Sequence, residues 1–268
     1  MEKKIIHISD VHFGDPTFSD ELKFNLLLQI QNENPDMIIF AGDLTYNGYL
    51  SEYNNVKEFI DELNSISETH VIPGNHDARN VGLMHFERLI GEPRFVRKSG
   101  ESIIIGLDSA REDINDGNIG SFQLEWLEDE LKEIPKEYSK IVTFHHHLIP
   151  IPQSGRERNI LLDSGDLLQL LRDHHVDLVL SGHKHVPNVV TVENMAIVNS
   201  GTATTKRVRG NGHPCYSEII INNSELDAYI LFTETGVKKR IAKYSFERTE
   251  VVDKMLSHKN EVAYRITP

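Results

Sequence analysis

The sequence predicts an α/β protein in which helices cover the faces of a β-sheet. Short apolar runs, of the kind that forms fully buried strands, alternate with amphipathic stretches of helical period as far as about residue 181. The chain has 268 residues, of which 39% are hydrophobic, so it can bury a core of ordinary size. After residue 186 only short strand-like runs follow one another, which indicates an antiparallel sheet added to the same core.

The elements of the first part follow from these runs in order. Strands are expected at 4–9, 37–41, 70–73, 103–107, 141–144 and 178–180, where Ile, Val and Leu predominate. Helices are expected between them at 20–31, 51–66, 121–134 and 163–174. Ser19 or Asp20 would cap the first helix, Ser121 begins the third, and Pro135 closes it.

The second part contributes strands at 189–192, 196–199, 216–221, 226–232 and 240–246. The segment Asn222-Asn223-Ser224 predicts a hairpin turn between two of them. We expect one domain over residues 1–246, followed by a tail at 247–268 whose pattern predicts no element.

Composition excludes several classes of protein. The formal charge is 28 − 41 = −13, which disfavours non-specific binding to a nucleic-acid backbone. The single cysteine, Cys215, excludes an intrachain disulfide and a cysteine metal site, and it fits a reducing, cytoplasmic location. No apolar run approaches the roughly 18 residues of a membrane span. Because a strand-like run begins at Lys4, no signal peptide is expected.

Polar clusters follow five of the predicted strands directly. They are Asp10-Val11-His12, Gly42-Asp43, Gly74-Asn75-His76-Asp77, His145-His146-His147 and Gly182-His183-Lys184-His185. Ligands of open α/β sheets bind at the carboxyl ends of the strands, so five such ends in one sheet predict a single constellation. Glycines within these clusters allow tight turns beside it.

The chemistry of these clusters predicts a metal site. Carboxylates, imidazoles and an amide oxygen are hard to borderline ligands, suited to Mn, Fe, Zn, Ni or Co. The candidate ligands are Asp10, His12, Asp43, Asn75, His183, His185 and one histidine of the triple at 145–147. Seven groups are too many for one tetrahedral zinc, and they suit two adjacent metals that share a carboxylate.

These blocks, in this order from Asp10 to His185, resemble those of the calcineurin-like binuclear metallophosphoesterases. The stretch Ser121-Phe122-Gln123-Leu124-Glu125-Trp126-Leu127 is similar to the branch that holds the class III cyclic nucleotide phosphodiesterases. The segment Gly201-Thr202-Ala203-Thr204, with Arg207 and Arg209, resembles the same branch. The resemblance implies two packed mixed β-sheets flanked by helices, a four-layer αββα sandwich.

The resemblance also implies a division of the ligands. One metal would be bound by Asp10, His12, Asp43 and His185, and the other by Asp43, Asn75, His145 and His183. Asp43 would then bridge the two. The resemblance favours His145, the first histidine of the triple, and its position directly after the strand agrees with this. Binding by His146 or His147 is the alternative, because Leu148 stands where the family usually has Pro.

Other residues would act on the substrate. By the resemblance His76 touches a phosphate oxygen or protonates the leaving alkoxide, and Asp77 holds its ring in one tautomer. The resemblance places His146 and His147 beside the metals or toward the substrate. Arg207 and Arg209 are candidates for phosphate contact, with a solvated loop as the alternative.

Three further arginines each have more than one candidate role. Arg79 is a candidate for phosphate contact, with a structural salt bridge as the favoured alternative. Arg156 and Arg158 stand in the segment 151–159, for which a lid over the site is one possible role.

The expected function is a metal-dependent phosphohydrolase, a phosphodiesterase that hydrolyses small phosphodiesters such as 3′,5′-cyclic nucleotides. A hydroxide bridging two metal ions (Mn, Fe or Zn, divalent or mixed-valence) would attack phosphorus in line. The partner is a small phosphoester and no nucleic-acid polymer. The alternatives are a nucleotide-sugar lipid pyrophosphatase or phosphomonoesterase of the same family, and a non-catalytic protein-interaction scaffold on the same fold.

Overall fold

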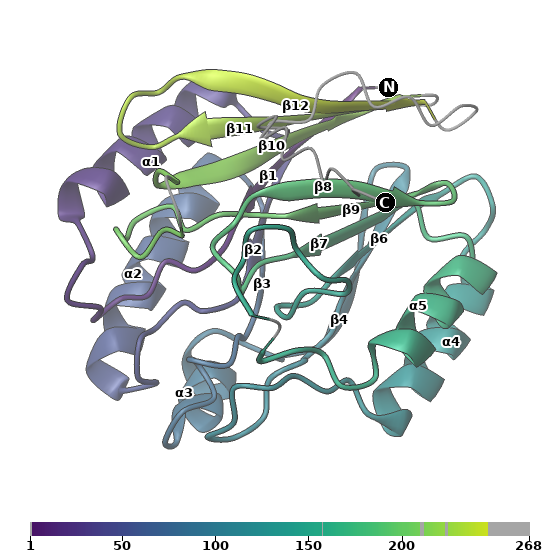
Figure 1. Ribbon diagram of the computed structural model, residues 1–268, viewed down its shortest axis with the longest axis horizontal. Coiled ribbons are helices and arrows are strands. Elements are labelled where there is room, and N and C mark those ends of the chain that lie inside the picture. Colours follow the sequence, from purple (N-terminus) through teal and green to yellow (C-terminus); the bar gives the residue numbers. More distant parts are fainter. Residues whose placement is uncertain (1, 157, 210–211, 223–224, 246–268) are drawn as a thin grey trace, which may run out of the picture.

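Two six-stranded sheets stack face to face in the computed structural model, which describes residues 2–156, 158–209, 212–222 and 225–245 (Figure 1). Helices α1 (Asp20–Glu33) and α2 (Leu50–Ile66) cover one sheet, and α4 (Ser121–Glu133) and α5 (Ser164–Asp173) cover the other. The expected four-layer αββα sandwich is therefore confirmed.

The first sheet has the strand order β12-β11-β10-β1-β2-β3. Its strands are β1 (Lys3–Ile8), β2 (Met37–Ala41), β3 (Thr69–Ile72), β10 (Cys215–Ile221), β11 (Glu225–Phe232) and β12 (Lys238–Ser245). Strands β1, β2 and β3 are parallel, whereas β10 joins β1 antiparallel and continues into an antiparallel meander.

The second sheet has the order β4-β5-β6-β7-β9-β8. Its strands are β4 (Phe95–Ser99), β5 (Ser102–Gly106), β6 (Ser139–Thr143), β7 (Leu178–Ser181), β8 (Asn188–Val192) and β9 (Met195–Asn199). Strands β5, β6, β7 and β9 are parallel, and the antiparallel strands β4 and β8 form the two edges.

Strand alternation explains why the layers stack in this order. In β1, Ile5 belongs to the core between the two sheets, while Ile6 and Ile8 belong to a second core under α1 and α2. Successive side chains of a strand point to opposite faces, so both faces of the sheet must be covered. The uniformly apolar runs of the sequence are the consequence of this double burial.

The structure corrects three expectations about the fold. The five polar strand ends belong to two facing sheets and not to one sheet: β1, β2 and β3 lie in the first, and β6 and β7 in the second. The late strands extend both sheets and do not form an antiparallel sheet of their own, and one of them, β9, pairs parallel with β7. Helix α3 (Gly82–Leu89) and strand β4 were not predicted from the sequence.

Some expectations fall on residues outside the described part. These are two of the three turn residues, 223 and 224, the end of the last strand at 246, and the tail at 247–268. The single domain over 1–246 stays a prediction. Among the described residues, none of the helices has both the length and the apolar character that crossing a membrane requires.

Candidate metal centre

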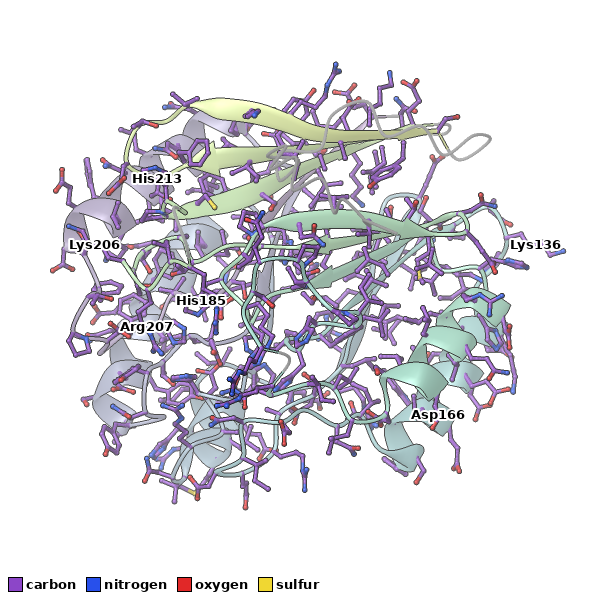
Figure 2. All side chains as sticks on the ribbon, in the orientation of Figure 1. Lys136, Asp166, His185, Lys206, Arg207 and His213 are labelled. Carbon is purple, nitrogen blue, oxygen red and sulfur yellow. The ribbon has the colours of Figure 1, made fainter. Side chains whose placement is uncertain are left out.

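The polar clusters of the two sheets meet at one end of the sandwich. Residues after β1, β2 and β3 reach it from the first sheet, and residues after β6 and β7 reach it from the second. Figure 2 shows His185 and Arg207 in this region, far from Lys136 and Asp166 at the opposite side of the molecule. The site is thus built from segments that lie up to 175 residues apart, from Asp10 to His185.

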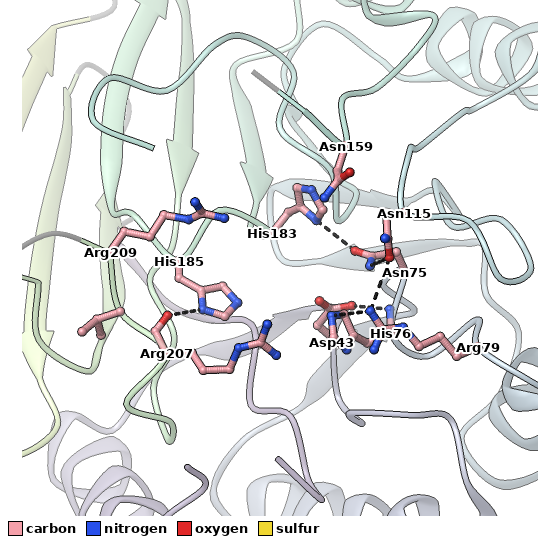
Figure 3. Close-up of a pocket in the computed structure, with 11 residues that line it drawn as sticks. Asp43, Asn75, His76, Arg79, Asn115, Asn159, His183, His185, Arg207 and Arg209 are labelled. Carbon is pink, nitrogen blue, oxygen red and sulfur yellow. Dashed lines mark hydrogen bonds between the residues drawn. The ribbon is translucent and has the colours of Figure 1, made fainter. Parts of the chain in front are cut away.

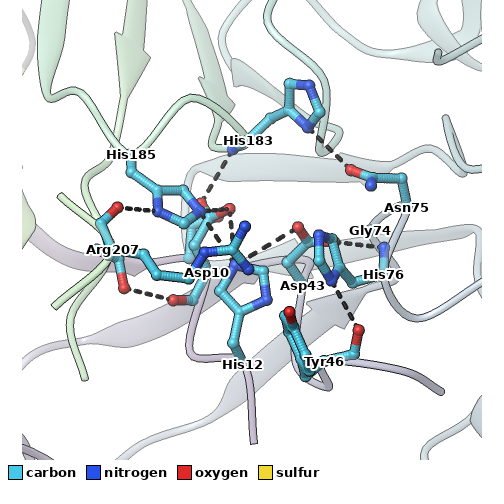
Figure 4. A network of polar contacts seen from close by, with 12 residues as sticks. Asp10, His12, Asp43, Tyr46, Gly74, Asn75, His76, His183, His185 and Arg207 are labelled. Atoms are coloured by element: carbon cyan, nitrogen blue, oxygen red, sulfur yellow. Dashed lines mark hydrogen bonds and ion pairs between the residues drawn. The ribbon is translucent and has the colours of Figure 1, made fainter. Parts of the chain in front are cut away.

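One group of candidate ligands consists of Asp10, His12 and His185 (Figure 4). Nε2 of His185 lies 3.1 Å from Oδ1 of Asp10 and 3.0 Å from Nε2 of His12. Nε2 of His12 lies 3.8 Å from Oδ1 of Asp10 and 3.7 Å from Oδ2 of Asp43. Asp43 therefore stands beside this group as well as beside the next.

A second group consists of Asp43, His145 and His183. Oδ2 of Asp43 lies 3.3 Å from Nε2 of His145, and Nδ1 of His183 lies 3.3 Å from the same Nε2. Nδ1 of His183 is also 2.9 Å from Oδ1 of Asn75. The structure thus brings together all seven predicted ligands, with Asp43 between the two groups.

Backbone carbonyls orient three of the imidazole rings. Nδ1 of His12 faces the Thr45 carbonyl at 3.3 Å, Nδ1 of His145 the Ala41 carbonyl at 2.8 Å, and Nδ1 of His185 the Arg207 carbonyl at 2.7 Å. Because a carbonyl only accepts, each Nδ1 carries a proton and each Nε2 faces the centre, where its lone pair is available to a metal once that nitrogen is deprotonated. This is how proteins commonly prepare a histidine for a metal.

The backbone at the site is strained. Asp10, His12, Asp43, His183 and His185 have φ between 53° and 74°, the left-handed region that side chains other than Gly rarely adopt. Such strain costs of order 1–3 kcal/mol per residue and concentrates at functional sites. The fold holds five of the seven candidate ligands in this way, so their positions are fixed by the surrounding structure.

The ionisation of the residues at the site favours a bound cation. Burial alone would raise the pKa of Asp43, but His145, His76 and His12 lower it well below its usual value. Burial would lower the pKa of His145, yet Asp43 beside it raises the pKa to about 9. Burial lowers the pKa of His12 to about 3, so that ring stays neutral, the form that binds metals.

The donor set fits a pair of metal ions. Oδ1 of Asp10 is buried and has no hydrogen-bond partner, although ring nitrogens of two histidines lie within 4 Å of it. A buried carboxylate oxygen without a donor is costly, and a cation at this position would remove that cost. Oxygen and imidazole ligands in two adjoining groups match two borderline divalent ions.

Glycines permit the close approach of the strand ends. A Cβ built on Gly182 would lie 2.6 Å from Oδ2 of Asp10, and one on Gly42 would lie 2.8 Å from Nδ1 of His145. No side chain fits at either position without displacing a candidate ligand. Oδ2 of Asp10 in turn accepts the His183 backbone N–H at 3.0 Å.

The segment after β9 supports the first strand end. Thr202 donates its hydroxyl to the Asp10 carbonyl, and Thr204 donates to the Val11 carbonyl, both at 2.7 Å. These bonds hold the Asp10–His12 turn from outside the metal-bearing strands. They give a structural role to the Gly201–Thr204 segment that the sequence had singled out.

His76 stands at the edge of the centre, but Asp77 does not hold its ring as expected. Nδ1 of His76 faces the Tyr46 carbonyl at 2.7 Å. Asp77 accepts instead from the backbone N–H groups of Leu44, Thr45 and Gly74 at 2.8–3.0 Å. These donors lie in the two turns that carry Asp43 and Asn75, so Asp77 ties those turns together.

The triple histidine divides into three environments. His145 reaches Asp43, as described above. Nδ1 of His146 lies 2.8 Å from the Ser109 hydroxyl and Nε2 lies 3.1 Å from the Asn115 carbonyl, so protein atoms occupy both ring nitrogens. The His146 ring lies 4.6 Å from the His183 ring, so of its two expected positions it occupies the one beside the candidate ligands and not the substrate-facing one. The ring of His147 stacks on His183 with centroids 5.7 Å apart.

A pocket of about 430 Å³ opens beside the centre (Figure 3). Its lining residues are Asp43, Asn75, His76, Arg79, Asn115, Asn159, His183, His185, Arg207, Val208 and Arg209. Both arginines predicted from the 201–209 segment are present. Arg207 pairs with Asp15 at 3.1 Å, and its guanidinium lies 5.4 Å from the centre of the Tyr46 ring.

Sequence reasoning missed Asn115 and Asn159 and gave Arg79 a structural role. Oδ1 of Asn115 accepts from Nδ2 of Asn75 at 3.2 Å and from Nη2 of Arg79 at 3.3 Å. Asn115 follows β5, a sixth parallel strand whose carboxyl end also leads to the site. The apolar run at 103–107 was therefore a signal for this loop, because it is also a buried strand whose carboxyl end leads to the site.

A two-sheet sandwich whose strand ends gather carboxylates and imidazoles is the arrangement of a metallophosphoesterase. The chain belongs to the calcineurin-like phosphoesterase family, whose sequence profile matches residues 3–187. This range includes all five motif blocks, so the resemblance and the expected phosphoesterase class are confirmed.

Several curated relatives are phosphodiesterases. A probable glycerophosphodiester phosphodiesterase GpdQ of Arcobacter nitrofigilis is 30% identical over 229 residues, which cover 76% of this chain and 79% of the relative. A probable cyclic nucleotide phosphodiesterase of Rhodococcus erythropolis is 28% identical over 216 residues (75% and 71%). The 3′,5′-cyclic adenosine monophosphate phosphodiesterase CpdA of Escherichia coli K12 is 29% identical over 160 residues (56% and 54%).

Solved structures share the fold. The purple acid phosphatase PPD1 of yellow lupin superposes with a TM-score of 0.70 at 15% identity, covering 90% of this chain and 53% of the lupin chain. A dimetal phosphatase of Danio rerio superposes with a TM-score of 0.66 at 14% identity, covering 84% and 95%. Identities this low establish the fold alone.

Proposed function

We propose that the protein is a two-metal phosphodiesterase that hydrolyses small phosphodiesters. The observation that carries the proposal is the convergence of seven buried oxygen and nitrogen ligands in two adjoining groups beside an open pocket. In this assignment Asp10, His12 and His185 would hold one ion, Asn75, His145 and His183 would hold the other, and the two sites would share Asp43. When bound, the two ions supply positive charge to the phosphate oxygens and acidify a water molecule.

The protein's own residues bind and orient the substrate. The guanidinium groups of Arg79, Arg207 and Arg209 line the pocket and offer donors in the planar geometry that suits phosphate oxygens. The Tyr46 carbonyl fixes the ring of His76 through Nδ1, so Nε2 faces the pocket. A proton held at that Nε2 can pass to the leaving oxygen.

The relatives' substrates favour a diester. Cyclic nucleotides and glycerophosphodiesters, after which the relatives are named, are small molecules, and a pocket of about 430 Å³ suits a ligand of that size. The formal charge of −13 disfavours a nucleic-acid polymer as substrate. The ligand chemistry admits Mn, Fe or Zn, and the single buried cysteine, Cys215, fits an enzyme of the cytoplasm.

A phosphomonoesterase or a nucleotide-sugar lipid pyrophosphatase would use the same metal ligands. These activities differ from a diesterase only in what surrounds the reacting phosphate, so one substrate panel separates them. The metal-free protein should be inactive, and added Mn²⁺ should restore hydrolysis of bis(p-nitrophenyl) phosphate and of cyclic AMP above that of p-nitrophenyl phosphate and of a nucleotide-sugar lipid.

Three results would overturn the proposal. Equal rates before and after complete chelation would remove the metals from the reaction. A preference for the monoester over both diesters would assign the site to phosphomonoesters. Absence of turnover on the whole panel, with two metals bound, would favour a non-catalytic scaffold.

A further inference from the structure

A second pocket of about 430 Å³ adjoins the metal pocket. Arg156, Arg158, Asn159, Lys184 and Arg209 line it. Asn159 and Arg209 also line the metal pocket, so the two cavities share a wall. In Figure 3 both residues lie on the His183 side of the metal pocket, across from His76 and Arg79. A ligand larger than one phosphate can therefore reach both cavities.

The second pocket is cationic in an acidic protein. Four of its five lining side chains carry a positive charge, while the whole chain has a formal charge of −13. Within the part of the chain that the structure describes, no carboxylate lines this pocket. Four cations around one cavity repel one another, and an anion placed among them would relieve that repulsion.

The structure fixes two of these cations. Arg209 donates from Nε to the Lys184 carbonyl and from Nη1 to the Ser154 carbonyl, both at 2.9 Å. Carbonyl acceptors leave the guanidinium charge uncompensated and leave further N–H groups for a ligand. Lys184 is only 3% exposed, and its ammonium group donates to the Arg158 carbonyl, which holds the loop that carries Arg158.

This arrangement links the second pocket to the metal centre. Lys184 stands between His183 and His185, two of the candidate metal ligands. Arg156 and Arg158 are exposed and line the second pocket but not the metal pocket. If one phosphate of a substrate lay at the metals, a second anionic group of the same molecule could extend past Asn159 and Arg209 and reach Arg156 and Arg158.

We propose that the second pocket binds a second phosphate, or a comparable anionic group, of the substrate. The inference rests on the proposed function of the metal site and narrows its substrate class to small phosphodiesters that carry a further phosphate. Arg156 and Arg158 bind this distal phosphate, since guanidinium groups pair with phosphate oxygens through two parallel hydrogen bonds. The role replaces the lid that the sequence had suggested for the 151–159 segment.

A matched pair of substrates tests the proposal. Thymidine 5′-(p-nitrophenyl) phosphate and its 3′-phosphorylated derivative share the scissile bond and the leaving group. With Mn²⁺ bound, the wild-type protein should show kcat/KM on the order of tenfold higher for the derivative, as expected for charge-assisted hydrogen bonds to one phosphate. The double variant Arg156→Gln/Arg158→Gln should lose this preference and keep the parent's kcat/KM for the unphosphorylated compound.

The double variant Arg88→Gln/Arg97→Gln is the control. Both residues are exposed and line neither pocket, so the same two charges are removed elsewhere on the chain. This variant should keep the preference for the phosphorylated compound. That result would show that the preference depends on the two arginines of the second pocket and not on the overall charge of the protein.

The outcomes separate the distal phosphate site from the phosphodiesterase activity on which it rests. If the wild-type protein hydrolyses both compounds equally well, the distal phosphate site is wrong while the phosphodiesterase stands. The same holds if the control loses as much preference as the pocket variant, or if the pocket variant slows both compounds equally. If the wild-type protein hydrolyses neither compound with metal bound, the proposed function fails and this inference fails with it.

Discussion

The guanidinium of Arg79 lies against the ring of His76, with Nη2 of the arginine 3.0 Å from Nε2 of the histidine. Nη1 of Arg79 donates at 3.0 Å to the Tyr46 carbonyl, the same oxygen that faces Nδ1 of His76. Burial lowers the pKa of His76, and the charge of Arg79 lowers it further, although Asp43 raises it. These effects favour the neutral ring while Arg79 donates to Nε2. For His76 to carry a proton at Nε2 and pass it to a leaving oxygen, Arg79 must turn away, as it would on pairing with a substrate phosphate.

Replacing His76 tests whether it acts on the substrate or on the metals. His76→Asn should keep both metals and lower kcat by roughly 10²–10⁴, the usual contribution of a positioned acid. Elemental analysis and steady-state kinetics on one diester check both parts. His213→Asn, an exposed histidine outside the site, is the control and should match the parent.

The structure also defines the contrary result. His12, Asp43 and His76 lie close enough together to form a third possible ligand group. Loss of metal from His76→Asn would assign His76 to the metals and would contradict its proposed role in proton transfer.

Asp43 should be the most consequential ligand. Its carboxylate stands 3.7 Å from His12 and 3.3 Å from His145, which belong to different groups. Asp43→Asn removes the negative charge that offsets both cations, so the purified variant should retain neither metal and show no turnover. The exposed Asp166→Asn is the matched control. If the Asp43→Asn variant retained both metals, Asp43 would not be a metal ligand.

Gly182 should not tolerate a side chain. A Cβ there would lie 2.6 Å from Oδ2 of Asp10, so Gly182→Ala should displace Asp10, lower metal content and destabilise the fold by about 1–3 kcal/mol. Urea unfolding and elemental analysis measure the two effects. Gly165→Ala meets no atom within 4 Å and should change stability by less than about 1 kcal/mol. Equal stability of the two variants would contradict the close packing described for the strand ends.

His7 should make folding stability depend on pH. It is fully buried, its two ring nitrogens have no hydrogen-bond partner, and burial lowers its pKa from 6.5 to about 3. Between these values the unfolded chain binds a proton that the folded chain does not, so stability falls as pH decreases from about 7 toward 3. From pH 7 to pH 5 this linkage amounts to about 2 kcal/mol.

The variant His7→Leu removes that titration. Its free energy of unfolding should fall less between pH 7 and pH 5 than that of the parent, by up to about 2 kcal/mol. Urea unfolding at both pH values, with the same metal content in both proteins, measures the difference. Equal slopes for parent and variant would show that His7 is protonated in the folded protein.

Local sequence pattern predicted the buried elements well and the others poorly. The helix at 20–31 appears as α1 with Ser19 as its cap, because an amphipathic face and a capping hydroxyl are local features. Helix α3 has no side-chain cap, and Gly82 and Phe86 are its buried residues, so its signal is weak. The division of the strands into two sheets depends on pairing between distant segments, which a local pattern does not contain.

The candidate ligands were predictable for a similar reason. Each follows a buried apolar run directly. Burying an unpaired polar group costs free energy, so a polar residue at such a position indicates a specific role. Asn115 and Asn159 come from loops whose composition resembles that of any solvated loop, and only the fold brings them to the pocket. Asp77 and His76 are neighbours in sequence, yet the turn sends their side chains to different partners.

The origin of the ligands in both sheets has a mechanical consequence. Asp10, Asp43 and Asn75 follow strands of one sheet, and His145 and His183 follow strands of the other. Cations bound between them would act as cross-links at that edge of the sandwich, as disulfides do elsewhere. Loss of the ions would then be thermodynamically coupled to separation of the two sheets at that edge, so a higher free ion concentration would favour the closed edge.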